Sequence, residues 1–113
     1  MEESKNPWKT LNTKKVYEND WILVEHHDVL NPSKNPGIYG KISFKNIAVG
    51  VIPVDEKGYT WLVGQYRYPL EKFSWEIPEG GSKLSDEPLD SAKRELEEET
   101  GISATKWTAL QEI

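Results

Sequence analysis

The stretch that most limits the fold runs from Pro88 to Gly101, because it carries a start signal and a stop signal for one helix. Proline suits the first helical position, where its missing N–H would have no partner in any case. Glycine suits the left-handed position that follows the last turn. Between them, Leu89, Leu96 and Thr100 recur at helical spacing and are predicted to face the core. The sequence therefore predicts a helix over about 88–100.

Strand-like runs surround this helix and predict an α/β protein. Apolar and polar residues alternate over 11–17 and 21–29, on either side of the turn residues 18–20, which is typical of a hairpin. The further strand-like runs are 39–44, 47–54, 59–66 and 103–110.

Three segments rich in glycine, proline or asparagine are predicted to connect these elements. Residues 55–58 end in a glycine that can take the positive φ of a short loop, so the runs on either side are predicted to pair as a hairpin. Residues 77–82, IPEGGS, are predicted to form a loop before the helix. Residues 31–37 are predicted to join an N-terminal β-unit, residues 1–37, to the main domain, residues 38–113.

The composition is that of one small globular domain. With 113 residues, 36% of them hydrophobic, the chain is large enough for a single core. It has no cysteine, so it offers neither disulfides nor thiolate ligands. A formal net charge of −5 argues against nonspecific binding to nucleic acid. The longest apolar run, 47–54, is too short to cross a bilayer, so we expect a cytoplasmic protein with no nucleic-acid or membrane partner.

Glutamates crowd the last turns of the predicted helix. Glu95, Glu98 and Glu99 share one arc of the helix at i, i+3 and i+4 spacing, while Glu97 points away. Carboxylates at a helix C-terminus oppose the helix dipole by roughly 0.3–1 kcal/mol each, and Arg94 offsets only part of that charge. A divalent cation is the simplest countercharge, because hard oxygen donors on a rigid helix suit Mg²⁺ or Mn²⁺. The alternative is a solvated acidic helix face.

The residues around the helix favour the metal site. From Gly80 to Ile102 the chain reads GGSKLSDEPLDSAKRELEEETGI, which resembles the Nudix box G-x5-E-x7-R-E-U-x-E-E-x-G-U, where U is aliphatic. The matching positions are Gly80, Arg94, Glu95, Leu96, Glu98, Glu99, Gly101 and Ile102. Asp86 stands where the motif has its first glutamate, and Glu87 follows one place later, so the acidic character is kept there.

The flanking segments narrow the resemblance to the ADP-ribose pyrophosphatase branch of the Nudix hydrolases. VYENDWILVEHH, IAVGVIPVDEKGYTWLVGQYRYP and WEIPEGG resemble that branch's N-terminal strands, its hairpin with a Q-x-R strand end, and its approach to the box. The likeness implies a Nudix-type α/β/α sandwich with a mixed sheet, preceded by the N-terminal β-unit. Because few residues follow the box, we expect the chain to lack the C-terminal part of the fold, and the catalytic base with it.

The resemblance also implies an activity. Such an enzyme uses Mg²⁺ or Mn²⁺ to hydrolyse the pyrophosphate bond of ADP-ribose or a related nucleoside diphosphate sugar, giving a nucleoside monophosphate and a sugar phosphate. Glu95 and Glu99 would be direct metal ligands, Glu98 a third ligand or water holder, and the carbonyl of Glu79 a backbone ligand. Arg94 would hold the carboxylates in place.

Two substrate contacts are implied outside the box. Arg67 stands at the strand end where the resembling enzymes place a substrate-binding arginine, whose guanidinium grips a phosphate; the alternative is an ordinary surface arginine. Trp21 or Tyr17 of the N-terminal unit is a candidate to stack on the base, as the partner's strands do in dimeric relatives, so a homodimer is expected. Trp75, beside the glycine-rich segment, is predicted to pack in the core.

Two other classes of function are alternatives to hydrolysis. A non-catalytic Nudix-like module that senses nucleotides need not keep every metal ligand, so the intact R-E-x-x-E-E favours the enzyme. A purely structural acidic domain does not explain the glycine-rich segment or the spacing of the box. The predicted partner is therefore a small molecule, a nucleoside diphosphate sugar.

Overall fold

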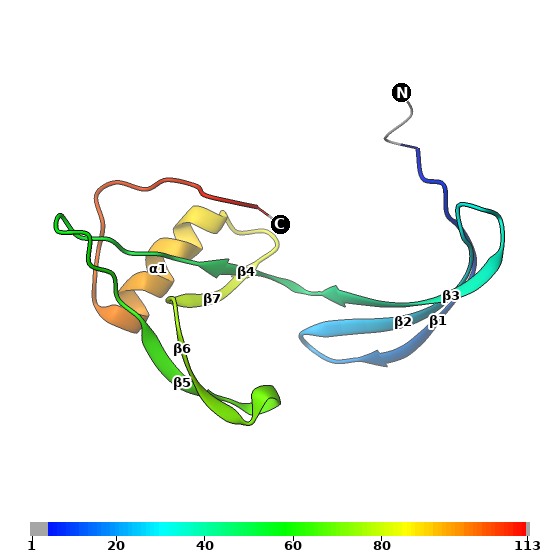
Figure 1. Cartoon of the computed structure of the whole chain (residues 1–113), viewed down its shortest axis with the longest axis horizontal. Coiled ribbons are helices and arrows are strands. Elements are labelled where there is room, and N and C mark those ends of the chain that lie inside the picture. Colours follow the sequence, from blue (N-terminus) through cyan, green and yellow to red (C-terminus); the bar gives the residue numbers. More distant parts are fainter. Residues whose placement is uncertain (1–4, 113) are drawn as a thin grey trace. The chain divides into compact units, whose positions relative to one another are not determined.

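The computed structural model describes residues 5–112, and these residues form strands, a short 3-10 turn and an α-helix (Figure 1). The contacts divide the chain into two compact units, one ending at Lys45 and the other beginning at Asn46. The first unit contains β1 (Lys9–Glu18), β2 (Ile22–Leu30) and β3 (Pro36–Phe44). The second contains β4 (Asn46–Gly50), β5 (Val63–Arg67), the 3-10 turn (Tyr68–Leu70), β6 (Lys72–Glu76), β7 (Glu79–Lys83) and α1 (Pro88–Thr100).

The first unit is one antiparallel sheet with β2 between β1 and β3. The predicted hairpin of β1 and β2 is confirmed. Its turn is closed by Asn19, whose side-chain oxygen accepts hydrogen bonds from the backbone N–H of Trp21 at 2.8 Å and of Ile22 at 2.9 Å. An asparagine that bonds the backbone two and three residues on is a common way to fix a turn.

Residues 31–37 were predicted to join two domains, but in the structure they lie at the turn between β2 and β3. Asn31 organises this turn, because its side-chain oxygen accepts a hydrogen bond from the N–H of Asn35 at 2.9 Å and its carbonyl accepts one from the N–H of Lys34 at 2.8 Å. β3 therefore pairs with β2 along its length, and the first unit extends to Lys45 rather than to residue 37.

The sheet of the first unit leaves many large apolar side chains exposed. These are Trp8, Leu11, Val16, Tyr17, Trp21, Ile38, Tyr39, Ile42 and Phe44. Val29 is the buried hydrophobic residue of this unit, and within the described part of the unit no helix covers either face of the sheet. The unit has little core of its own.

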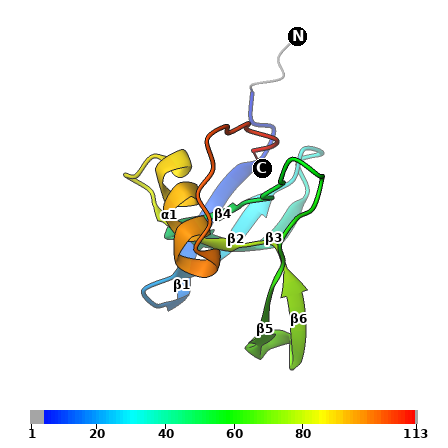
Figure 2. The ribbon, with the colours of Figure 1, turned by 90° about the vertical axis from the view of Figure 1, so that its left-hand side faces the viewer.

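In the second unit, α1 packs on the two-stranded sheet of β4 and β7 (Figures 1 and 2). Leu96 is the centre of this contact, with only 1% of its surface exposed. Ser91, nearer the start of α1, is also buried, and its hydroxyl donates a hydrogen bond to the buried Ser82 of β7 at 2.8 Å. β5 and β6 form a separate antiparallel hairpin that extends away from the helix in both views.

The predicted pairing of 47–54 with 59–66 is wrong. The structure keeps only a single bridge between Val54 and Thr60, while β4 pairs with β7 and β5 pairs with β6. The turn itself forms as predicted, since Asp55 accepts hydrogen bonds from the N–H of Lys57 and of Tyr59 and Gly58 has a φ of 84°. The pairing of these two segments does not continue past Val54, because the next residue, Pro53, has no N–H to donate to a neighbouring strand.

Two other predictions of secondary structure are corrected. Residues 79–82 of the predicted loop belong to β7 (Glu79–Lys83), because their backbone completes a ladder with β4. Residues 103–110 form no strand, and in both views the chain after Gly101 returns past α1 as irregular chain (Figures 1 and 2).

The predicted helix is confirmed from Pro88 to Thr100, with proline at its start and Gly101 in the left-handed conformation at its end, φ 73°. Leu89 was predicted to face the core, but 44% of it is exposed. The buried position in the first half of α1 is Ser91, because a small side chain lets the helix approach β7 closely. No helix within residues 5–112 is long and apolar enough to cross a membrane.

Candidate active site

Gly80 provides the space in which the Glu95 carboxylate lies. Strand residues alternate between faces, so Gly80 and Ser82 share the face of β7 that packs on α1. A Cβ on Gly80 would lie 2.1 Å from Glu95 Cδ and 2.4 Å from Glu95 Oε2, far closer than atoms can approach. The motif glycine is therefore required by the position of the motif glutamate.

The last turn of α1 reaches the beginning of β7. The backbone N–H of Glu79 donates a hydrogen bond to Glu99 Oε2 at 3.3 Å. This N–H does not bond to β4. Val51 and Pro78 form a hydrogen-bonded pair of the ladder, so the next pair, Gly50 and Glu79, is a non-hydrogen-bonded pair whose N–H groups point away from the partner strand. Glu95 and Glu99, one helical turn apart, thus both lie against β7.

Arg94 links the helix to β7 and to its neighbouring carboxylates. Its Nη2 donates a hydrogen bond to the carbonyl of Gly81 at 3.2 Å. The same nitrogen lies 3.5 Å from Glu95 Oε1, and Nε lies 3.9 Å from Glu98 Oε1. The Glu98 side chain is 61% exposed, whereas that of Glu95 is only 15% exposed. The two glutamates therefore differ in how firmly the protein holds them.

Asp86 lies in the loop between β7 and α1, where its N–H donates to the carbonyl of Lys83 at 3.0 Å. It lines a small pocket beside Arg94. The other lining residues are Asn46, Gly81, Ser82 and Lys83. Asp86, at the first acidic position of the box, and Arg94, at its arginine position, therefore border the same pocket.

Arg67, at the end of β5, is held by two carboxylates. Its Nε lies 2.9 Å from both carboxylate oxygens of Glu76, and its Nη2 bonds to Glu76 and also to Glu79. The hydrogen bonds between Arg67 and Glu76 are the main reason why the pKa of Glu76 is lowered and the pKa of Arg67 is raised. Each shift favours the charged form, so Arg67 and Glu76 form an ion pair at neutral pH.

Glu76 was not among the residues predicted for the site. It lies on β6, and the register places it opposite Val63, on the face of the hairpin that also carries Arg67. No local sequence signal links the two residues, because Lys72 is the residue opposite Arg67 and Glu76 lies at the other end of the ladder.

The carboxylates of α1 fit a divalent cation in chemical kind, because oxygen donors on one helix face are what Mg²⁺ and Mn²⁺ bind. Glu95 and Glu99 are already fixed against β7 by the Gly80 contact and by the Glu79 N–H. Within residues 5–112, however, no three acidic or histidine side chains are gathered closely enough to form a complete metal cage. The donors are placed on a common surface rather than assembled around one point.

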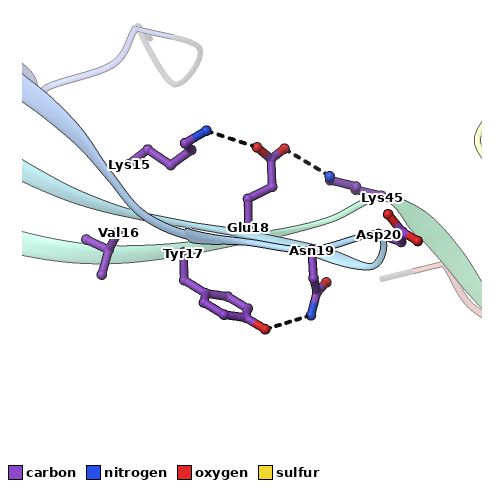
Figure 3. A pocket seen from close by; sticks show the side chains of 7 residues that line it. All are labelled: Lys15, Val16, Tyr17, Glu18, Asn19, Asp20 and Lys45. Atoms are coloured by element: carbon purple, nitrogen blue, oxygen red, sulfur yellow. Dashed lines mark hydrogen bonds and ion pairs between the residues drawn. The ribbon is translucent and has the colours of Figure 1, made fainter.

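The aromatic candidates of the first unit lie at the β1–β2 turn. Trp21 is 65% exposed, and Tyr17 is also exposed. Figure 3 shows a pocket at this turn in which Glu18 lies between Lys15 and Lys45, with Tyr17 and Asn19 on the other side of the strand. Trp21 does not line this pocket.

Trp75 was predicted to pack in the core, but it does not. It is 68% exposed on β6 and packs edge to face against Phe73, with ring centroids 5.3 Å apart. Both rings cover Gly64 of the neighbouring strand, where a Cβ would lie 2.3 Å from Phe73 and 3.0 Å from Trp75. The indole is held by the hairpin itself, not by the helix layer.

The chain belongs to the Nudix family, because residues 44–113 match the NUDIX domain. Residues 8–42 match the nucleoside diphosphate sugar hydrolase N-terminal domain. A crystal structure of an ADP compounds hydrolase superposes with a TM-score of 0.76 at 22% identity, over 88% of this chain and 54% of that one. The predicted α/β class and Nudix-type fold are thereby confirmed.

Curated relatives carry several names. The ADP-ribose pyrophosphatase of Bacillus subtilis and the methanol dehydrogenase activator of Bacillus methanolicus are each 36% identical over 107 residues, which is 90% of this chain and 55% of each relative. The RNA pyrophosphohydrolase of Bartonella quintana is 38% identical over 74 residues, 58% of this chain and 43% of the relative. The chain spans about half the length of these relatives.

Proposed function

We propose that the protein hydrolyses the pyrophosphate bond of ADP-ribose or a related nucleoside diphosphate sugar, with Mg²⁺ or Mn²⁺, to a nucleoside monophosphate and a sugar phosphate. The observation that carries the proposal is the way the glutamate-rich helix lies on β7, with Glu95 filling the space over Gly80 and Glu99 accepting from the Glu79 N–H. The match to a sugar-hydrolase N-terminal domain supports the substrate class.

The proposed metal-binding groups are the carboxylates of Glu95, Glu98 and Glu99 and the carbonyl of Glu79. A bound divalent ion would neutralise the diphosphate oxygens and make the attacking water more acidic. Arg94 orients two of the carboxylates, since it contacts Glu95 and Glu98 while its Nη2 is anchored on the Gly81 carbonyl. Its role is to hold these ligands rather than to bind the substrate.

The proposed substrate contacts are Arg67 and Trp21. The Nε and Nη2 groups of Arg67 are taken by Glu76 and Glu79. Within residues 5–112 its Nη1 has no hydrogen-bond partner, so Nη1 is the group that would meet a phosphate of the substrate. Trp21 presents an exposed indole on which a base can stack.

The proposed assembly is a homodimer in the cytoplasm. The sheet of the first unit exposes a large set of apolar side chains and has little core of its own, and exposed apolar patches of this kind mark interaction surfaces. Light scattering at micromolar concentration tests the assembly, and a monomer at that concentration would contradict it.

The test of function is the release of AMP from ADP-ribose in the presence and absence of Mg²⁺. Glu98→Gln and Glu99→Gln should each lower turnover by orders of magnitude without loss of fold. Glu97→Gln is the matched control, because it removes the same charge from the same helix at a position that faces away from β7. Equal turnover rates in all three variants at saturating Mg²⁺ would contradict the assignment of Glu98 and Glu99 as metal ligands.

A substrate panel defines the leaving group. It should contain ADP-ribose, other nucleoside diphosphate sugars and an RNA with a 5′-triphosphate end, with the products identified by chromatography. Cleavage of the sugar nucleotides supports the proposal, and cleavage of the RNA alone would overturn the substrate class. Binding of ADP-ribose without Mg²⁺-dependent cleavage would instead identify a nucleotide sensor.

A further inference from the structure

The contacts of Arg67 connect three strands. The guanidinium belongs to the end of β5, Glu76 to the end of β6 and Glu79 to the beginning of β7. Two nitrogens of the guanidinium supply all the bonds, which is possible because the planar fork of arginine presents several donors in fixed directions. Lysine, with its single ammonium group, could not reproduce this arrangement.

The connection continues from β7 into the helix. The residue whose side chain Arg67 holds, Glu79, is also the residue whose backbone N–H bonds to Glu99. The position of the Glu99 carboxylate therefore depends on the position of the Glu79 backbone, and that backbone is tied through its own side chain to the β5–β6 hairpin.

We infer that Arg67 is a positioning residue for the metal-binding end of the site, acting on Glu99 through Glu79. The inference rests on the proposed function, because it takes Glu79 and Glu99 as metal-binding residues. It goes beyond a phosphate contact, since it gives the two bonded nitrogens of Arg67 a role before any substrate is present. Glu76 is the residue that holds Arg67 itself in place.

Charge and position predict opposite effects for the loss of Arg67. A guanidinium near a metal site repels the incoming cation, so its removal should strengthen metal binding if charge were its only influence. If Arg67 instead places Glu79 and Glu99, its removal should weaken metal binding. Loss of a residue that orients metal ligands typically lowers metal affinity by about 10–100-fold. The sign of the change therefore separates the two explanations.

The experiment is a titration of the protein with Mn²⁺ alone, followed by electron paramagnetic resonance of the free ion. We expect Arg67→Ala to weaken Mn²⁺ binding by about 10–100-fold, and Arg67→Lys to weaken it to a lesser degree. Lys72→Ala is the matched control, because Lys72 stands opposite Arg67 in the hairpin register and carries the same charge outside the cluster. It should bind Mn²⁺ as tightly as the wild type, or slightly more tightly.

A second readout follows the proposed connection directly. Hydrogen exchange at the Glu79 amide should be faster in Arg67→Ala, while exchange at buried amides of α1 stays unchanged. Mn²⁺ binding that is unchanged or tighter in Arg67→Ala would overturn the inference and leave the proposed function intact. A wild-type protein that binds no Mn²⁺ would remove both. If Arg67→Ala does not fold, Arg67→Lys is judged by the same two criteria.

Discussion

The hydroxyl of Ser91 on α1 donates to the hydroxyl oxygen of Ser82 on β7, and Ser82 in turn donates to the carbonyl of Lys83 at 3.3 Å. Both serines are about 1% exposed. The relay satisfies two buried hydroxyl groups inside the contact between helix and strand, where an unpaired donor would be costly. Its direction makes the two serines unequal.

Ser82→Ala should destabilise the protein more than Ser91→Ala. The first change leaves the Ser91 hydroxyl buried without its acceptor, at a cost of about 1–3 kcal/mol. The second removes the donor but leaves Ser82 bonded to Lys83, at a cost of about 1 kcal/mol. Urea denaturation of both variants measures the difference, and equal costs would show that Ser91 finds another acceptor.

Gly80→Ala should damage the site while Gly81→Ala should not. The new methyl group would collide with the Glu95 carboxylate, so we expect a loss of about 1–3 kcal/mol in stability together with weaker Mn²⁺ binding. Gly81 is the adjacent control, since a Cβ there would meet no atom within 4 Å. In the double variant with Glu95→Ala the stability should return, although the metal affinity should not. Thermal denaturation and Mn²⁺ titration measure the two effects separately.

Leu96→Ala should cost roughly 2–5 kcal/mol of stability, as expected for a fully buried leucine. Leu89→Ala, on the same helix but largely exposed, should cost much less. The comparison holds the chemistry of the substitution constant and changes only the burial. Similar unfolding midpoints for both variants would mean that the helix presents a different face to β7.

Glu18 should make the first unit sensitive to acid. Hydrogen bonds from Lys45 and Lys15 lower the pKa of its carboxyl below the ordinary value. A group whose pKa is lower in the folded state stabilises that state above its unfolded pKa, and this stabilisation is lost as the pH falls through the folded pKa. Lys45→Met should raise the pKa of Glu18 in an NMR titration, whereas Lys14→Met should leave it unchanged.

The parts of the fold that follow from neighbouring residues could be predicted from the sequence. The ends of the helix are set by Pro88 and Gly101, and each of these acts over a turn or less. The turns at Asn19 and Asp55 likewise depend on side chains that bond their own backbone. Such signals do not require knowledge of which strands meet.

The pairing of strands could not be predicted in the same way. The run 47–54 has a strand-like composition, but its partners lie near residue 77. The Ile77 side chain packs against Gly50, where a Cβ would lie 2.8 Å from it, and the N–H of Val51 donates to the carbonyl of Pro78. These partners are remote in sequence. The contact of Arg67 with Glu76 and the packing of Trp75 on Phe73 both lie within the β5–β6 hairpin, so they were missed with its pairing.

The hydrogen bond from the Glu79 N–H to Glu99 affects how readily β7 can pair with a strand of another molecule. Within residues 5–112, β7 pairs only with β4, so its other edge has no strand partner, although Glu99 accepts from the Glu79 N–H and Arg94 donates to the Gly81 carbonyl. An open edge of this kind is a template for aggregation. The carboxylate of Glu99 occupies the first donor on that edge, and the acidic end of the helix repels other acidic chains. We therefore expect Glu99 to hinder the pairing of another strand with this edge of β7.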